Sequence, residues 1–402
     1  MGLLMLATAC GLAGWRVLRP PQAGSAAPVA APWVAASSTS VPALAAEAAR
    51  SIAASAVQPQ ASGSAGAESK EFVEVCGFGR VKRADMDGKS EEPPPWAQVW
   101  ERQAEEGRAS LLRRLEAGSP GQRISAAVLR DDVQAAAALA ATTTDAAAYR
   151  LALSACRNDA TRRFAFARPP LPPASNPSGV FLTEPQAPGP LPTACAALTL
   201  ERLELLNPGD AWPWQARMQD SQQRGDAAGV SQALYQFAQR ARTAPPFRPL
   251  SIAMAEVAAA EPTPEEAMAL MMVLGKDMVI MQSPHFEISR ACRPETLGDA
   301  NRRQLCEQAV RRLPEMTTEL IEASLLYRLE ERVGLAHSAK ALQRDEGNRV
   351  LEAMAADSMR WLKEPSCGSL SRMGRQLALL ARQGELAYAR TVMKDRPASA
   401  PP

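Results

Sequence analysis

The most informative stretch for the architecture is residues 195–240, CAALTLERLELLNPGDAWPWQARMQDSQQRGDAAGVSQALYQFAQR. Apolar residues recur here at spacings of three and four, which is typical of amphipathic helices. Pro208 ends the first helical segment because proline cannot continue a helix, and Gly225 permits a tight turn between the segments that follow. The stretch therefore predicts a helix, a turn and a second helix.

This stretch resembles the tetratricopeptide repeat. In that family an Asn-Pro pair ends one helical hairpin, an aromatic residue opens the next, and Gly-Asp marks the turn between its two helices. The matching residues are Asn207-Pro208, Trp214 and Gly225-Asp226. The residues that depart from the family's preferences are Arg217, Met218 and Val230. The resemblance is confined to this stretch, and it implies a stacked α-helical array that binds proteins or peptides on a concave face, without any chemistry.

Helical patterns continue on both sides of this stretch, from the prolines at 93–95 almost to the end of the chain. Asp299 and Thr263 are placed to begin helices, because the side-chain oxygen of each can accept from the first turn of the segment that follows. The fold class that follows is all-α: an irregular array of antiparallel helical hairpins with a short extended N-terminal arm. We expect helices at about 96–117, 122–141, 144–157, 194–206, 211–224, 227–243, 247–260, 264–275, 300–312, 316–333, 337–360, 368–383 and 385–394.

The chain divides by composition. Ala, Pro, Ser and Gly dominate residues 20–70, a composition that buries too little apolar surface to offset its ordering entropy. We therefore expect a disordered tether there. The expected segments are a membrane anchor or signal-like segment at 1–19, the tether at 20–70, an extended arm at 71–95, an α-helical domain at 96–394 with a proline-rich excursion at 158–191, and a disordered tail at 395–402.

The N-terminal segment is apolar over residues 1–15 but short for a membrane span, which needs about 20 residues. An uncleaved anchor fits best, because the stretch stays apolar beyond Cys10. A lipoprotein signal that ends at Cys10 is an alternative. Arg16 and Arg19 favour a cytoplasmic location for the chain that follows, and this orientation stays open as a further alternative.

Six cysteines remain outside the N-terminal segment. They show no Cys-x-x-Cys spacing, and neither of the two histidines lies close to one in sequence, so a zinc site is not expected. Separated cysteines behind a membrane-type segment indicate disulfides in an oxidising compartment, which favours the periplasm; free thiols in a cytosolic protein are the alternative. Cys156 and Cys195 flank the proline-rich excursion, Cys292 and Cys306 lie close in sequence, and Cys76 and Cys367 remain.

Charge and composition exclude some functions. The formal net charge is +2, which excludes bulk electrostatic capture of nucleic acid, so we expect no nucleic-acid partner. Two histidines exclude catalysis or metal binding by several histidines. The chain has 38 arginines and 7 lysines, and acidic residues interleave with them, which is typical of solvated helix faces.

Residues 71–83, EFVEVCGFGRVKR, show the clearest alternation of apolar and other residues in the chain. A glycine-rich phosphate loop around Gly77 and Gly79 is the more specific interpretation, but neither a following helix nor a Gly-Lys-Ser/Thr motif supports it. We expect an extended arm that packs on the helical body and is held there by Cys76.

Trp212 and Trp214, on either side of Pro213, are the candidate binding residues. Two exposed indoles so spaced would form an aromatic clamp for a peptide or glycan strand, whereas burial of at least one of them is the alternative. The methionines within 268–281 suggest Cu(I) binding or, in the simpler interpretation, a helix core. For His285 and His337 we expect surface or capping roles.

No serine-hydrolase elbow, Ser-x-x-Lys, metallopeptidase helix or Walker loop occurs in the sequence, so we expect no catalytic residues, cofactor or metal. The function that follows is a non-enzymatic, membrane-tethered periplasmic scaffold that binds another envelope protein or a peptide. One alternative is a periplasmic module for a small ligand or cell-wall fragment near the two tryptophans. An enzyme that uses acidic residues is another.

Overall fold

A computed structural model describes residues 71–83, 95–167, 193–244, 246–280, 283–350 and 365–395. The chain divides into units 1–70 and 71–402, and all described residues belong to the second. The predicted anchor and tether, the main part of the proline-rich excursion and residues 396–402 of the predicted tail lie outside the described residues. Among the described helices, none combines the length and apolar character needed to cross a membrane.

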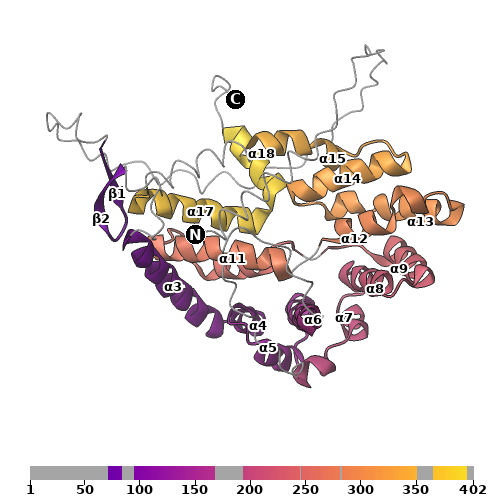
Figure 1. Cartoon of the computed structure of the whole chain (residues 1–402), viewed down its shortest axis with the longest axis horizontal. Helices are drawn as coiled ribbons and strands as arrows, with labels where there is room; N and C mark the ends of the chain where they lie inside the picture. Colours follow the sequence, from indigo (N-terminus) through magenta and orange to yellow (C-terminus); the bar gives the residue numbers. More distant parts are fainter. Residues whose placement is uncertain are drawn as a thin grey trace, which may run out of the picture. The chain divides into compact units, whose positions relative to one another are not determined.

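The described part is mainly helical, which confirms the predicted all-α class (Figure 1). The helices that precede residues 195–240 are α3 (Pro95–Glu116), α4 (Pro120–Leu129), α5 (Val133–Ala140) and α6 (Ala146–Ala167). The stretch itself holds α7 (Leu200–Leu206), α8 (Trp212–Gln223) and α9 (Ala227–Arg240). After it come α10 (Pro249–Val257), α11 (Pro264–Ile280), α12 (Pro284–Ala291), α13 (Ala300–Val310), α14 (Leu320–Val333), α15 (Ala339–Leu342), α17 (Cys367–Gln383) and α18 (Glu385–Asp395). Short 3₁₀ turns lie at Thr193–Ala197, Pro294–Thr296 and Leu313–Met316.

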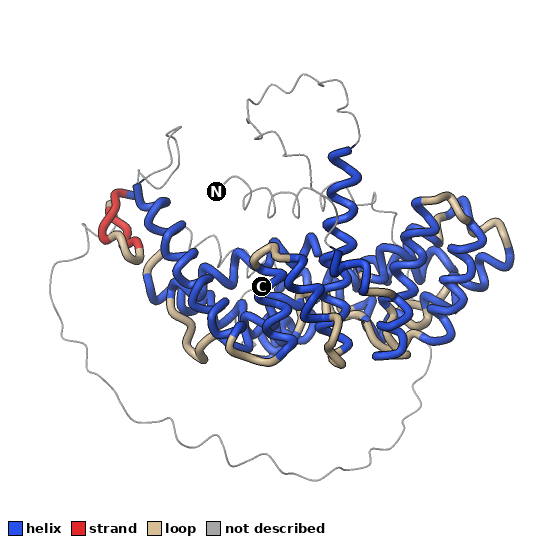
Figure 2. Tube along the Cα trace, turned by 90° about the horizontal axis from the view of Figure 1, so that it is seen from below, coloured by secondary structure: helices blue, strands red, loops and turns tan. Residues whose placement is uncertain are grey.

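A β-hairpin forms the N-terminal end of the described residues, shown in red in Figure 2. Strand β1 (Phe72–Val75) pairs antiparallel with β2 (Gly79–Lys82), and Val73 lies opposite Val81. Gly77 and Gly79 have positive φ, so they form the reversal of the chain rather than a phosphate loop. The expected extended arm is thus a two-stranded hairpin, which satisfies backbone groups that a single arm would leave unpaired.

The first core brings together helices that are far apart in sequence. It gathers buried residues of α3, α4, α5, α6, α10, α11 and α17, such as Leu115, Tyr149 and Leu270. Helix α11 packs between α3 and α17 (Figure 1). Gly107 on α3 and Gly374 on α17 allow these close approaches, because a side chain at Gly107 would overlap the backbone of α11 at Glu265 and one at Gly374 would meet Ala267.

The second core is made from helices that follow one another. It contains buried residues of α8, α9, α12, α13, α14 and α15, such as Phe237, Ile288 and Leu326. Helix α8 packs on α9 and on α12, and α9 packs on α13. The intervening pair, α10 and α11, instead returns to the first core, so the chain leaves the second core after α9 and re-enters it at α12.

Two helix starts confirm the capping predictions. Asp299 accepts a hydrogen bond from the backbone N–H of Arg302 over 2.8 Å, and Thr263 Oγ1 accepts from that of Glu266 over 3.3 Å. Each satisfies an amide that the first helical turn leaves without a partner.

The helix predicted at 122–141 is wrong in one respect, since it is two helices, α4 and α5. Asp131 adopts φ 60°, which no helix continues through, and Asp132 then caps α5 by accepting from the backbone N–H of Ala135 over 2.9 Å. Apolar residues lie on both sides of this break, so apolar periodicity carries no sign of it.

Four other elements differ from the expectations. Helix α6 continues to Ala167, into the segment expected to be irregular, and α11 continues five residues beyond 275 to Ile280. Helix α12 was not predicted, since its eight residues hold little more than two turns and begin with a proline that resembles a loop signal. Within the expected helix 337–360, the described helical residues are Ala339–Leu342 and 344–350, and Gln343 separates these two segments. Residues 351–360 lie outside the described residues.

The six cysteines lie at disulfide distance in the three expected pairs. Cys156 pairs with Cys195 across 39 residues, Cys292 with Cys306 across 14, and Cys76 with Cys367 across 291. The first pair joins α6 to the 3₁₀ turn before α7, and the last joins the β-hairpin to the first residue of α17. Each bridge therefore connects elements that the chain itself leaves apart.

Several arginines stabilise helix ends rather than lying on solvated faces. The final carbonyl groups of a helix have no hydrogen-bond donor inside the helix, and they carry the negative end of its dipole. A guanidinium group from a neighbouring element supplies the donor and also places a positive charge at this end. The donors and carbonyl acceptors are Arg108 and Leu129 (2.8 Å), Arg114 and Val257 (2.9 Å), Arg312 and Ala238 (3.0 Å), and Arg332 and Cys292 (3.1 Å).

Candidate functional site

The helical hairpin α8–α9 follows the predicted pattern closely. Asn207 ends α7, and α8 begins at Trp212. Gly225 has φ 70° in the turn, and Asp226 caps α9 by accepting a hydrogen bond from the backbone N–H of Gly229 over 2.8 Å. The proline, glycine and aspartate of the sequence pattern therefore each carry the local role expected of them.

The tryptophans of this hairpin are buried, so the expectation of an exposed aromatic clamp is wrong. Trp212 is 5% exposed and belongs to the first core, whereas Trp214 is 6% exposed and belongs to the second. Side chains two apart on a helix point about 200° from each other, so a single turn of α8 directs one indole into each core. Their main role is to join the two cores.

A pocket of about 500 Å³ lies along α8 and α9, and Trp214 is part of its wall. Guanidinium groups approach the indole from both helices, that of Arg217 at 4.7 Å from the ring centroid and that of Arg240 at 5.5 Å. Cation–π contacts of this kind hold a guanidinium in place while its N–H edge stays available for hydrogen bonding. The other lining residues are Asp220, Ser221, Arg224, Asp226, Gly229, Gln232, Ala233 and Gln236.

The carboxylates in the pocket wall already have partners. Asp220 forms an ion pair with Arg157 at 2.5 Å, and Asp226 is occupied in capping α9. Arg217 pairs with Glu201 at 3.1 Å and also with Glu204, both on α7.

Two cations of the pocket remain without a carboxylate. Arg224 and Arg240 are exposed, and within the described part of the chain neither lies within ion-pair distance of an acidic side chain. The indole Nε1 of Trp214 also has no hydrogen-bond acceptor among the described residues, although it is buried. The wall of the pocket therefore has more donors than acceptors.

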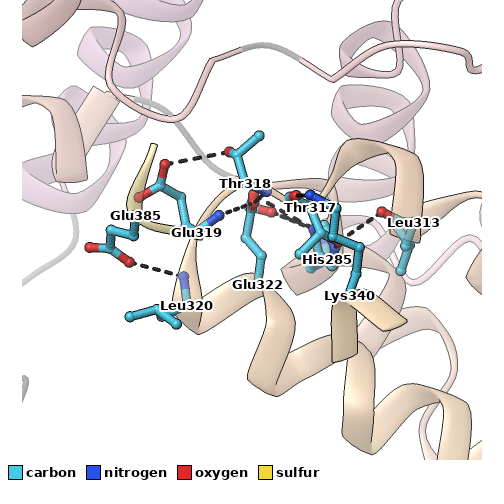
Figure 3. A network of polar contacts seen from close by, with 10 residues as sticks. His285, Leu313, Thr317, Thr318, Glu319, Leu320, Glu322, Lys340 and Glu385 are labelled. Atoms are coloured by element: carbon cyan, nitrogen blue, oxygen red, sulfur yellow. Dashed lines mark hydrogen bonds and ion pairs between the residues drawn. The ribbon is translucent and has the colours of Figure 1, made fainter. Parts of the chain in front are cut away.

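A second polar feature lies where the ends of α10, α14 and α18 meet. Arg248, just before α10, pairs with Glu319 at 3.1 Å and also with Glu385, the first residue of α18. Glu319 and Glu322 form a capping box at the start of α14, and Glu385 accepts from the backbone N–H of Leu320 over 2.9 Å (Figure 3). We call Arg248, Glu319, Glu322 and Glu385 the junction network.

Burial controls the protonation of the junction network. Burial, opposed by the charge of Arg248 and assisted by the nearby carboxylates of Glu385 and Glu322, raises the pKa of Glu319 to about 8. Burial alone would lower the pKa of Arg248, but the charges of Glu385 and Glu319 outweigh it and raise that pKa. At neutral pH the arrangement is thus a protonated Glu319 beside an ion pair of Arg248 and Glu385.

Asp277 on α11 is a further buried carboxyl near this junction. Its oxygens accept from the backbone N–H groups of Leu250 and Ser251, each over 2.8 Å, and from Ser251 Oγ over 2.5 Å. Burial still raises its pKa to about 6. Asp277 therefore caps the start of α10 from another helix, an interaction that sequence spacing cannot show.

His285 is fully buried, so the expected surface role is wrong, although it does lie in the first turn of α12. Its Nδ1 lies 2.8 Å from Ser283 Oγ and its Nε2 lies 2.9 Å from Thr317 Oγ1. Burial lowers its pKa, which keeps the ring neutral. Both ring nitrogens are occupied by hydroxyl groups, so the site holds α12 against the turn before α14.

His337 is partly exposed and precedes Ser338, the cap of α15. Its ring stacks on Tyr327 with 3.7 Å between centroids, and its Nδ1 lies 3.5 Å from a carboxylate oxygen of Glu330. These contacts agree with the expected role near a helix start.

The methionines of the candidate copper site differ in burial. Met268 is buried among residues of α3 and α17, whereas Met272 is 47% exposed. Met271 packs at the edge of the same cluster as Met268, and Met281 lies outside the described residues. The core interpretation therefore suits Met268 and Met271. Across the described ranges, no group of three or more His, Cys, Asp or Glu side chains is arranged to hold a metal ion.

Sequence analysis missed Arg224 and Arg240 as site residues. The available signal was their spacing: Arg224 follows Trp214 by ten residues and Arg217 by seven on the same helix, which places all three on one side of α8. Arg240 carried no such signal, because its contact with Trp214 depends on how α9 packs on α8.

Comparisons of the chain with protein-family models, with curated proteins and with solved structures gave no match. The arrangement of its own residues is therefore the basis for assigning a function.

Proposed function

We propose that the chain is a non-enzymatic, membrane-tethered helical scaffold of the periplasm that binds another envelope protein through the α8–α9 hairpin. The observation that carries this proposal is the donor-rich pocket on that hairpin, with Arg224 and Arg240 left without acidic partners. Exposed cations in a pocket wall reduce the stability of the free protein little, and a partner with complementary charge would gain binding free energy from them.

The order in which the helices of the second core pack supports this proposal. Helix α8 packs on α12 while α9 packs on α13, so the two hairpins α8–α9 and α12–α13 stack in the way that helical repeat arrays do. Such arrays present one continuous face to a partner. The hairpin α8–α9 lies first in this stack, which leaves one of its faces for the pocket.

The three cysteine pairs support a periplasmic location. Disulfides form and persist in oxidising compartments, and three pairs at bonding distance leave none of the described cysteines over. The apolar segment at 1–19 would hold the chain at the inner membrane, with residues 20–70 as the tether.

The alternative function, binding of a small ligand or a cell-wall fragment, is favoured by one observation. The pocket volume of about 500 Å³ lies within the range of small-molecule sites, which is about 300–1,000 Å³. Peptide crosslinks of the cell wall carry carboxylates, so the same arginines would suit them.

Photo-crosslinking in cells tests the proposed function. A photoreactive residue at Gln232 or Tyr235, both exposed on α9, should join the chain to one defined envelope protein, identified by mass spectrometry. The same residue at Arg123, exposed on α4 in the first core, is the matched control and should not capture that protein. Equal capture from α9 and α4, or partners confined to the cytosol, would contradict the proposal.

A further inference from the structure

The pocket beside Trp214 contains more unmatched hydrogen-bond donors than its own acidic residues can satisfy. Three guanidinium groups line it, and of these only Arg217 has carboxylate partners among the described residues. The two carboxylates in the wall, Asp220 and Asp226, are already used by Arg157 and by the backbone of α9. A ligand that supplies acceptors would complete this set.

The indole of Trp214 fixes where those acceptors would bind. Arg217 and Arg240 lie within 4.7 and 5.5 Å of the ring centroid, so the ring holds two cations from different helices close to one point. Arg217 is already paired with Glu201 and Glu204, whereas Arg240 brings a positive charge to the ring without an acidic partner among the described residues.

We propose that this pocket binds carboxylate groups from a short acidic segment of the partner protein. The inference depends on the proposed function for the existence of a protein partner, and it adds the chemistry of the contact. Planar guanidinium groups bind carboxylates through two parallel hydrogen bonds, which gives both strength and orientation. Arg224 and Arg240 make these bonds, and Trp214 with Ala233 forms the apolar part of the wall.

A binding measurement with defined peptides tests the inference. Fluorescence anisotropy of a labelled hexaglutamate peptide is followed with the full oxidised chain and with R224Q/R240Q. Both arginines are exposed, so the variant is expected to fold, and its melting temperature checks this. The variant should bind at least about tenfold more weakly, which corresponds to about 1.4 kcal/mol. A labelled hexaglutamine peptide should not bind either protein.

The matched control is R123Q/R311Q, which removes the same charge from two exposed arginines on α4 and at the end of α13. It should leave the affinity for hexaglutamate unchanged. Equal weakening by both variants would show diffuse electrostatic attraction and overturn the inference, as would the absence of binding to the unaltered chain. Tighter binding of inorganic phosphate than of the peptide, measured by displacement, would also overturn it.

The two proposals fail in distinguishable ways. If R224Q/R240Q still captures the same envelope protein from α9 in cells, the scaffold function holds and the assignment of the pocket is wrong. If the capture is lost together with peptide binding, and R123Q/R311Q retains both, the pocket is the contact.

Discussion

The two cores of this protein are built from different distances along the chain. In the first, α3, α11 and α17 pack side by side although about 250 residues separate the end of α3 from the start of α17. A cysteine pair that closes 39 residues belongs to this core, and a pair that closes 291 residues joins the β-hairpin to its helix α17. In the second, α8, α9 and α12 to α15 follow in order, and its cysteine pair closes only 14 residues. The difference teaches that the covalent links which remove the most entropy from the unfolded chain hold the helices that are far apart in sequence.

Removal of the longest cysteine pair should give the largest effect. Replacement of both cysteines, C76S/C367S, releases a closure of 291 residues, which the loop-entropy model values at about 6 kcal/mol of unfolding free energy. Removal of the pair in the second core, C292S/C306S, should cost about 3 kcal/mol, because it closes only 14 residues.

Denaturant unfolding followed by circular dichroism measures both losses. The variant C156S/C195S, with a closure of 39 residues, serves as the intermediate case and should lose about 4 kcal/mol. Equal losses of unfolding free energy in all three variants would contradict this comparison between the cores. The largest loss in C292S/C306S would contradict it as well.

The junction network, which links α10 of the first core to α14 of the second, predicts a pH effect of intermediate size. The folded-state pKa of Glu319 is about 8, above its ordinary value of 4.5, so between these values the folded protein holds a proton that the unfolded chain has released. The contribution of Glu319 to the free energy of unfolding is therefore largest below pH 4.5, and it is lost as the pH rises toward 8.

Other buried groups in this region titrate at lower pH. The pKa of Asp277 is about 6, and His285, whose pKa is lowered from 6.5, affects stability only below that value. Between pH 6.5 and 8 we therefore expect a fall of up to about 2 kcal/mol that depends on Glu319.

The variant E319Q carries a neutral side chain at every pH and should remove this fall. Thermal unfolding at several pH values checks it, with E331Q, an exposed position on the same helix, as the control that keeps the slope. An unchanged slope in E319Q would show that the cores are not coupled through this carboxyl.

Two glycine substitutions should give the smallest effects, of opposite sign in the two cores. Gly334 ends α14 with φ 78°, where alanine is strained, so G334A should destabilise the protein by about 1 kcal/mol. Gly275 lies exposed inside α11 with an ordinary helical backbone, so G275A should stabilise it by about 0.5–1 kcal/mol.

A Cβ at either position meets no atom within 4 Å, so backbone conformation alone distinguishes the pair. Melting temperatures measured under one condition suffice to test it. Shifts in the same direction would contradict the assignment of backbone conformation at these two sites.

Local chemistry allowed much of the fold to be predicted. Apolar spacing gave the helical class, and the short side chains of Asp299 and Thr263 gave two helix starts. Pro208 and Gly225 marked the ends of helices at the hairpin, because each restricts or frees the backbone at its own position. The break at Asp131 and the short helix α12 were missed, since neither changes the local apolar pattern.

The candidate site was harder to predict because it depends on contacts between distant residues. Trp212 and Trp214 were predicted as an exposed clamp, but their burial in separate cores depends on helices from other parts of the chain. Arg240 reaches Trp214 only through the packing of α9 on α8, and Arg248 meets Glu319 and Glu385 from three separate helix ends. Sequence spacing describes one helix at a time, so it contains none of these relations.

The turn of α8 that carries both indoles has a consequence for cooperativity. If the second core opened by itself, α8 would lose its packing and would withdraw Trp212 from the first core, which would then lose its largest aromatic contact on that side. The two cores are therefore expected to melt in one transition, with equal calorimetric and van't Hoff enthalpies, despite their different construction. A shared helical turn of this kind makes one folding unit from two hydrophobic clusters.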